Sequence, residues 1–387
     1  GAATQTGQTY AATAQDQSAV YVLHAGYLTL TDCVLTKVGD ASSVDQSSRY
    51  GINAGLLVAS GGAVTLSGSS ITTNASGANG LFATGTGSAI TMAGGAIDAS
   101  GGSAHGVDVT YGGVITLTGV DVTTHGLSSS ALATDFGGGT VTVVGGAITA
   151  ANTSTDSRSA GIYSTGTISV TGAVVSSLGD CGGVIDGANS IHLSDTDLTG
   201  ALHGIKIWKT APSGGGATVL LDGGSLTSGT GDAFHVTDAT GHAASASITV
   251  TGGATIHAGS GHILQVLGTS TATFMIDGAA LTGTLRADSP ATAIVSLENS
   301  ASLKGSASGI GLGIDASSTW EVTKNSVLTT LSDPAGISGL TITNIVGNGH
   351  DVHYDAGLAA NSYLGGQVYT LVNGGTLTPA IVPVHEG

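Results

Sequence analysis

The sequence is poor in charge, proline, cysteine and aromatic residues. Only 9% of its 387 residues are charged and five are proline, so it has neither the charge-rich composition of disordered chains nor the proline content of collagen. It contains no run of about 18 apolar residues, the length that a membrane-spanning helix needs. Its 65 glycines, with abundant Thr, Val and Ile, favour strands and turns over helices. The composition therefore predicts an ordered, all-β chain.

Basic residues are also scarce. Eight Lys and Arg oppose 25 Asp and Glu, which gives a net charge of −17. Nucleic acid and anionic membrane surfaces are bound mainly through basic side chains. We therefore expect no nucleic-acid partner and no membrane insertion by this chain.

A short apolar motif recurs along the chain, as LTL at 28, VTL at 64, ITM at 90, ITL at 115, VTV at 141 and ISV at 168, and onward to FMI at 274. From residue 64 the steps are 23 to 29 residues long, and the longer first step indicates an inserted loop at 40–50. A fixed period of this length is typical of solenoids. In VITLTG, alternation places Ile115 and Leu117 on one face and Thr116 and Thr118 on the other.

The repeat predicts a single-stranded parallel β-helix, or β-solenoid, of about twelve turns with three short strands each. We divide the chain into an N-terminal strand segment that could dock a subunit (1–18), a regular solenoid (19–311), irregular C-terminal turns (312–378) and a tail (379–387).

The segments GLFATGTGSAITMAGGAID, GVDVTYGGVITLTGVDV and GIYSTGTISVTGAVV resemble the secreted bacterial right-handed parallel β-helix proteins, which include passenger-like and adhesin-like surface proteins. The resemblance covers about residues 15–375. It implies a right-handed solenoid at the cell surface, and it leaves function open, because this fold serves enzymes, adhesins and structural proteins alike.

The segment SDTDLTGALHGIKIWK (194–209) is the main candidate site, and it gathers acidic, basic and aromatic residues in a chain that has few. Its His-Gly and basic-Ile-Lys elements faintly resemble polygalacturonase-type hydrolases, but the Asn-Thr-Asp and Asp-Asp elements are absent. An enzyme here would depend on Asp195 or Asp197. The alternatives are a patch that binds glycan or a neighbouring subunit through His203, Lys206, Trp208 and Lys209, or an irregular turn of no special function.

GNGHDVHYD (347–355) is a weaker candidate for a metal site. Strand alternation would place Asp351, His353 and Asp355 on one face. An exposed strand face would look the same, so we predict no metal and no cofactor. Repeated T-x-T pairs such as Thr116 and Thr118 resemble those of ice-binding solenoids, yet threonine is common on any exposed strand.

The two cysteines, Cys33 and Cys181, lie about six turns apart, which is close to 30 Å at roughly 4.8 Å per turn. A disulfide needs Cα atoms within about 7 Å. We expect both to be free, buried or paired between subunits.

A solenoid exposes unpaired backbone groups at both ends, and docking of one end on another would build a fibre. The residues that we expect to take part are Tyr10, Val20, Tyr21, Val22, Val368, Tyr369, Leu371, Ile381, Val382 and Val384. Pro379 and Pro383 could instead blunt the last edge.

These features together favour a non-enzymatic, extracellular structural protein of the cell surface or matrix that self-assembles end to end into a homo-polymer. The alternative is an adhesin that binds surface glycans through side loops, and a polysaccharide-degrading enzyme comes third.

Overall fold

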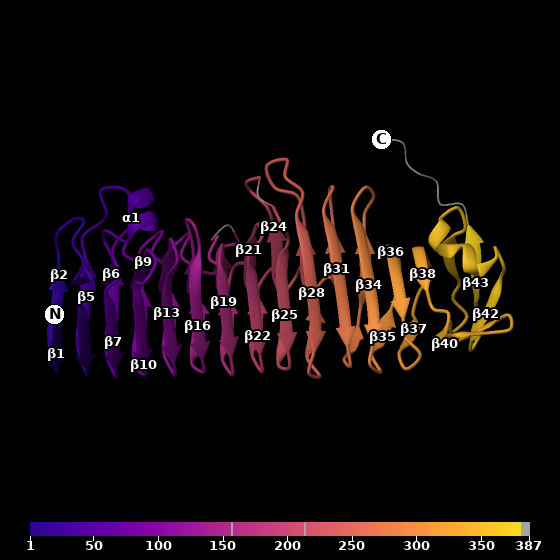
Figure 1. Cartoon of the computed structure of the whole chain (residues 1–387), viewed down its shortest axis with the longest axis horizontal. Helices are drawn as coiled ribbons and strands as arrows, with labels where there is room; N and C mark the ends of the chain where they lie inside the picture. Colours follow the sequence, from indigo (N-terminus) through magenta and orange to yellow (C-terminus); the bar gives the residue numbers. More distant parts are fainter. Residues whose placement is uncertain (156–157, 213, 381–387) are drawn as a thin grey trace.

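The strands stack in parallel along one axis. The computed structural model describes residues 1–155, 158–212 and 214–380, and these form a β-solenoid of about fourteen turns (Figure 1). At roughly 4.8 Å per turn the rod is about 62 Å long. This confirms the predicted fold class, with about two turns more than the motif count indicated.

Each regular turn contributes one strand to each of three columns, which we call the groove column, the second column and the third column. The groove column consists of β3 (Val20–Val22), β6 (Leu56–Ala59), β9 (Leu81–Thr84), β12 (Val107–Thr110), β15 (Leu132–Thr134), β18 (Ile162–Ser164), β21 (Gly183–Asp186), β24 (Ile205–Trp208), β27 (Phe234–Val236), β30 (His262–Val266) and β33 (Thr284–Ala287).

The second column consists of β1 (Ala2–Thr6), β4 (Tyr27–Thr31), β7 (Ala63–Ser67), β10 (Ala89–Ala93), β13 (Gly113–Thr118), β16 (Gly139–Val144), β19 (Thr167–Thr171), β22 (Ser190–Ser194), β25 (Ala217–Asp222), β28 (Ser245–Thr251), β31 (Thr271–Asp277) and β34 (Thr292–Glu298).

The third column forms a separate sheet of β2 (Thr9–Ala12), β5 (Val34–Val38), β8 (Ser70–Asn74), β11 (Ala96–Ala99), β14 (Asp121–Thr124), β17 (Ala147–Ala150), β20 (Val174–Ser177), β23 (Asp197–Gly200), β26 (Ser225–Ser228) and β29 (Thr255–Ala258).

The last turns are less regular. They contain β32 (Ala280–Thr282), β35 (Ser302–Gly305), β36 (Ala307–Ile314), β37 (Thr319–Val322), β38 (Ser326–Ser332), β39 (Ile337–Ser338), β40 (Thr341–Val346), β41 (Val352–Asp355), the 3-10 helix η1 (Ala359–Leu364), β42 (Tyr369–Val372) and β43 (Thr376–Ala380). Two antiparallel pairs, β39 with β40 and β42 with β43, interrupt the parallel stacking here.

The core is a continuous ladder of Val, Ile and Leu side chains that runs through the inside of the rod. In β13, Ile115 and Leu117 are fully buried whereas Val114 and Thr118 are exposed. This alternation follows from the two-residue period of a strand. The threonine column on the outside of the rod runs from Thr4 to Thr142 in register and then ends at Ser169.

The inserted segment at 40–50 is partly helical, which the sequence analysis missed. Helix α1 (Val44–Tyr50) begins at Ser43, whose side chain accepts a hydrogen bond from the N–H of Gln46, and it ends at Gly51 in the left-handed conformation. The helix lies along the upper edge of the rod beside β6 and β9 (Figure 1). A small apolar cluster outside the main core, with Leu57 and Phe82 buried, lies on this part of the groove column.

The ends correct several of the predicted boundaries. Residues 1–18 form the first turn of the solenoid, with β1 and β2 paired to β4 and β5. The predicted tail does not start at 379, because Pro379 lies within β43 opposite Tyr354.

Four of the predicted docking residues belong to the core, since they occupy inward positions of their strands: Val20, Val22, Tyr369 and Leu371. Tyr21 and Val368 are exposed, Tyr10 is half-buried, and Ile381, Val382, Pro383 and Val384 lie outside the described residues. In the described part of the chain, no helix is long and apolar enough to cross a membrane.

Candidate functional site

The outer face of the groove column carries an unusual row of side chains. Asp108, Ala133, Tyr163, Val184 and Lys206 stand opposite one another on successive strands from β12 to β24. The side chains in this row differ in size, because those of Ala133 and Val184 are small whereas those of Tyr163 and Lys206 are large. Small side chains beside large ones leave a hollow on the surface.

A groove of about 1080 Å³ follows this row. It is lined by Ser48, Ser103, His105, Leu127, Ser128, Ser130, Asp135, Thr155, Arg158, Ala160, Tyr163, Asp180, Cys181, Val184, Leu202, Lys206 and Trp208. Apart from Ser48, these residues come from the five successive turns that contain β12 to β24, so this part of the groove runs for roughly 19 Å along the rod. A residue of α1, Ser48, lies at one end and β24 lies at the other.

The floor of the groove is apolar. Ala160, Cys181 and Val184 form a buried cluster against which Tyr163 and Trp208 pack. Burial raises the pKa of the Cys181 thiol to about 12, so it stays protonated at neutral pH. Cys181 and Cys33 are both free and buried, as predicted.

Lys206 and Trp208 form the wall of the groove on β24. Strand alternation buries Ile205 and Ile207 completely and leaves Lys206 and Trp208 half-buried on the outer face, as predicted. The Lys206 ammonium lies 4.2 Å from the centroid of the Trp208 ring, which is a cation–π contact. The Trp208 Nε1–H is buried and has no hydrogen-bond partner among the described residues.

Two carboxyl groups at the α1 end of the groove have raised pKa values. Burial raises the pKa of Asp135 to about 6, and its backbone N–H bond with Phe136 and the charge of Arg49 oppose the rise only in part. Asp108 is fully buried, and burial followed by the charge of Asp135 raises its pKa well above the usual value. Neither oxygen of Asp108 accepts a well-formed hydrogen bond from a described residue.

The predicted acidic pair is not part of this groove. Asp195 lies in a turn with a positive φ, and Asp197 begins β23 in the third column, where it accepts a hydrogen bond from Ser225. Sequence proximity was misleading here, because residues 194–209 run from the end of β22 in the second column through β23 in the third column to β24 in the groove column. Lys209 follows β24 and is half-buried.

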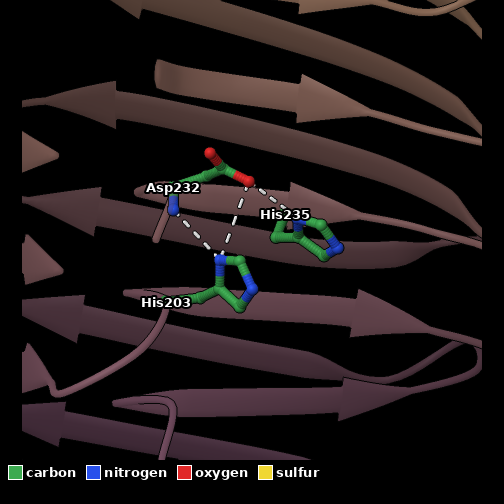
Figure 2. A group of neighbouring side chains, drawn as sticks. All are labelled: His203, Asp232 and His235. Atoms are coloured by element: carbon green, nitrogen blue, oxygen red, sulfur yellow. Dashed lines mark hydrogen bonds and ion pairs between the residues drawn. The ribbon is translucent and has the colours of Figure 1, made fainter. Parts of the chain in front are cut away.

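His203 also lies apart from Trp208, in a group with Asp232 and His235 (Figure 2). The rings of His203 and His235 are stacked, with centroids 4.1 Å apart. The Nδ1 atom of His235 is 2.7 Å from Oδ2 of Asp232, and the Nδ1 atom of His203 is 3.7 Å from the same oxygen. Since His235 stands opposite Lys206 on the next strand, this group adjoins the end of the groove.

The weaker metal candidate shows the predicted alternation but no convergence. On β41, Val352 and Tyr354 are buried and His353 and Asp355 are half-buried. Asp351 accepts hydrogen bonds from the N–H and hydroxyl of Thr376, and Asp355 accepts one from the N–H of Gly357. The carboxylates of Asp351 and Asp355 therefore face different partners.

Most of the groove, including Tyr163 and Asp135, was not predicted from the sequence. Aligning the repeats by strand position would have shown a signal: one outward position reads Asp108, Ala133, Tyr163, Val184 and Lys206, where a plain solenoid would carry Thr or Ser. Asp232 and His235 could have been found in the same way, from DAFHV at the position of HGIKI.

Comparisons with known proteins give no family for this chain. No known protein family and no curated protein matches it in sequence. What the site can do therefore has to be argued from its own geometry.

Proposed function

We propose that this chain is a non-catalytic, extracellular β-solenoid that binds a saccharide in the groove between α1 and β24. The observation that carries the proposal is the lining of the groove, with Trp208 and Tyr163 on an apolar floor. Ligand sites are mostly apolar and have a few well-placed polar groups that fix orientation. The groove of this rod has that composition.

The polar rim of the groove favours a saccharide over a purely apolar ligand. Hydroxyl groups come from Ser48, Ser103, Ser128, Ser130 and Thr155, and charged groups from Asp135, Arg158, Asp180 and Lys206. A saccharide presents both C–H faces, which pack on aromatic rings, and hydroxyl groups, which exchange hydrogen bonds with such a rim. The elongated shape suits an oligosaccharide better than a single sugar.

Saccharide binding is expected to depend on Trp208. In a screen of the purified chain against an array of oligosaccharides, we expect a subset to bind and Trp208→Ala to weaken that binding at least tenfold, because aromatic side chains in partly buried pockets dominate binding energies. Lys206→Met is expected to have a smaller effect, since it removes a charge but keeps most of the packing.

Matched control substitutions lie elsewhere on the surface. Tyr21→Ala removes an exposed aromatic ring and Lys324→Met an exposed charge, both away from the groove. Equal binding by Trp208→Ala and wild type would contradict the proposal. Release of reducing sugar by the wild-type protein that is lost in Asp135→Asn would instead indicate a hydrolase.

End-to-end association is a second candidate function, and the exposed first turn favours it. Gly7 donates its N–H to Thr31 and the carbonyl of Gly1 accepts the N–H of Tyr27, so odd-numbered residues of β1 face β4. In a strand, alternate residues point their backbone groups to opposite sides. Ala2, Thr4 and Thr6 therefore direct their N–H and C=O groups outward, as an edge on which another strand could pair.

Thr4→Pro is expected to block such association without breaking the pairing of β1 with β4, because it removes only an outward N–H. Sedimentation velocity over a hundredfold concentration range should show larger species for the wild type and a single small species for Thr4→Pro. Val144→Ala, an exposed substitution on β16 in the middle of the rod, serves as the control. A wild-type protein that stays monomeric at every concentration would contradict end-to-end assembly.

A further inference from the structure

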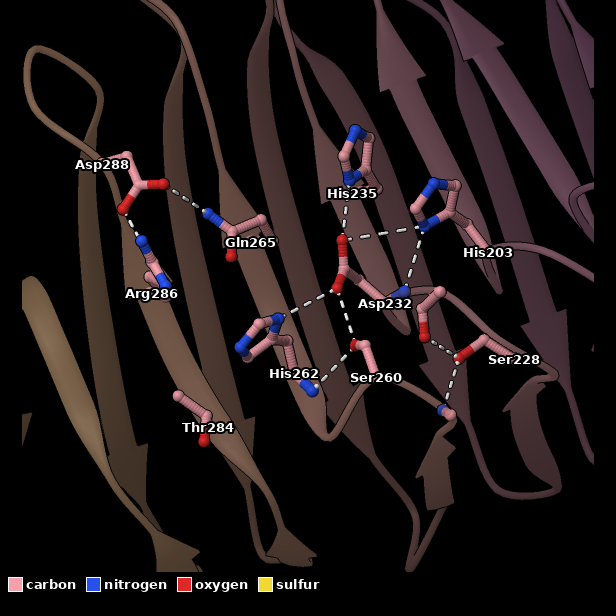
Figure 3. A network of polar contacts seen from close by, with 12 residues as sticks. His203, Ser228, Asp232, His235, Ser260, His262, Gln265, Thr284, Arg286 and Asp288 are labelled. Atoms are coloured by element: carbon pink, nitrogen blue, oxygen red, sulfur yellow. Dashed lines mark hydrogen bonds and ion pairs between the residues drawn. The ribbon is translucent and has the colours of Figure 1, made fainter. Parts of the chain in front are cut away.

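Four polar side chains from three successive turns meet at one corner of the rod (Figure 3). His203 precedes β24 and Asp232 precedes β27, while His235 lies within β27 and His262 begins β30. The N–H of Gly204 donates to the carbonyl of Asp232, and the N–H of Ala233 donates to that of His262. The stacking of the turns therefore brings His203, Asp232 and His262 to the same position in consecutive turns.

The ligand atoms of His203, Asp232 and His235 lie within 4.8 Å of one another. Two of the separations, 2.7 Å and 3.7 Å, join Oδ2 of Asp232 to the two Nδ1 atoms. A tetrahedral zinc ion with bonds of about 2.0–2.2 Å holds neighbouring donor atoms roughly 3.4 Å apart. The observed separations bracket this value, so small side-chain rotations would accommodate an ion.

The protonation states suit a cation. Burial opposes ionisation of Asp232, but hydrogen bonds from His235 and Ser260 outweigh it and lower the pKa to about 2. Burial, and then the neighbouring His235, lowers the pKa of His203 to about 4. At neutral pH the group thus offers a carboxylate and a neutral imidazole, which are the forms that bind metals.

Groups around Asp232 hold its carboxylate in place. Ser260 donates to Oδ1 at 2.7 Å, and Nδ1 of His262 lies 3.1 Å from the same oxygen. Oδ2 is left to face His203 and His235 (Figure 2). Hydrogen bonds from surrounding residues orient carboxylate ligands in this way at known metal sites.

His105 shows what a purely structural histidine looks like at this corner. Its Nδ1 accepts the N–H of Ser130 in the next turn at 2.9 Å, as Nδ1 of His203 accepts the N–H of Asp232 at 3.0 Å. His105 is nearly fully buried, whereas the side chain of His203 is 23% exposed. The carboxylate and the second imidazole beside His203 are therefore additions to the structural role.

We propose that His203, Asp232 and His235 bind a divalent transition-metal ion, with Zn²⁺ as the best match. Two imidazoles and one carboxylate suit zinc, whereas Ca²⁺ and Mg²⁺ prefer ligand sets made entirely of oxygen. The ion replaces the Nδ1 proton of His235 that faces Oδ2 of Asp232. It also competes with the backbone N–H of Asp232 for Nδ1 of His203. The partial exposure of the side chains gives it a path of entry and room for a water ligand. The proposal does not rest on saccharide binding.

The test is calorimetric titration of the EDTA-treated, saccharide-free chain with ZnCl₂. We expect one ion to bind per chain, to raise the melting temperature, and to bind at least tenfold more weakly in His235→Gln and Asp232→Asn. His257→Gln, which alters an exposed histidine of β29, is the matched control and should bind as the wild type does. MgCl₂ should give no binding at the same concentrations.

Two results would overturn the proposal: a wild-type chain that does not bind Zn²⁺, or variants that bind it as tightly as the wild type. Circular dichroism establishes that each variant is folded. If one is not, the Co²⁺-loaded wild type decides the question, because a visible spectrum of octahedral type excludes the tetrahedral site and one of tetrahedral type supports it.

Discussion

Replacement of Trp320 by alanine is expected to lower the free energy of unfolding by about 3–5 kcal/mol, the range for large aromatic side chains in cores. Trp320 on β37 is fully buried between Leu303 and Ile345 of the adjoining turns. Its Nε1–H donates to the carbonyl of Gly305 at 3.1 Å. The substitution removes the packing of the ring and one of the two hydrogen bonds that this carbonyl accepts, the other of which comes from the N–H of Thr323.

The other tryptophan supplies the matched control. Trp208→Ala makes the same chemical change at a half-buried position on the outer face, so we expect a much smaller loss of stability. Urea unfolding followed by circular dichroism measures both. Saccharide binding should be weakened by Trp208→Ala, whereas folded Trp320→Ala should bind nearly as the wild type does. Equal destabilisation by both substitutions would mean that Trp208 is a core residue rather than part of a ligand site.

Asp108→Asn is expected to stabilise the protein by at least about 1 kcal/mol at pH 7.5, because a charged group buried without partners costs more free energy than a neutral polar group in the same place. The buried carboxyl of Asp108 has a raised pKa in the folded chain. At pH 7.5 the unfolded chain carries this carboxyl ionised, so folding must either bury the charge or take up a proton. Asparagine has nearly the same shape and needs neither.

The effect should disappear in acid. A carboxyl whose pKa is higher in the folded state contributes stability below its unfolded pKa of about 3.9, and loses it as the pH rises towards the folded value. Asp135, with a pKa of about 6, acts in the same direction over this window. Denaturant unfolding at pH 3.5 and 7.5 measures the difference, with exposed Asp222→Asn as the control. A destabilised Asp108→Asn at pH 7.5 would show that the carboxylate has a partner, such as a bound cation.

The fold and the core were predictable because they depend on local patterns. Alternation in segments such as VITLTG determines which side chains face inward. The period of about 25 residues determines which strands of successive turns stack on one another. Helix α1 was missed because seven residues carry too short a pattern, although Ser43 and Gly51 are typical of helix ends. The first turn was predicted as a strand segment but was not counted as a turn, since TQTGQTY lacks the apolar motif on which the count relied.

The candidate site could be predicted only in part, because the groove depends on which residues of successive turns stand opposite one another. Lys206 and Trp208 stood out by their rarity and do lie together. Asp195 and Asp197 stood out equally and lie elsewhere. The partners of His203 are 29 and 32 residues further along the chain, and turn lengths of 23 to 29 residues hide such a match until the strands are aligned.

Quenching of tryptophan fluorescence by acrylamide tests saccharide binding in the groove most directly. The chain has two tryptophans, and Trp320 is fully buried, so a quencher in solution reaches mainly Trp208. The oligosaccharide that binds most tightly on the array is expected to protect Trp208 from quenching, in a saturable manner and with the same affinity as in direct binding. Saturable binding of that oligosaccharide with unchanged quenching would place it elsewhere on the rod and contradict our account of the groove.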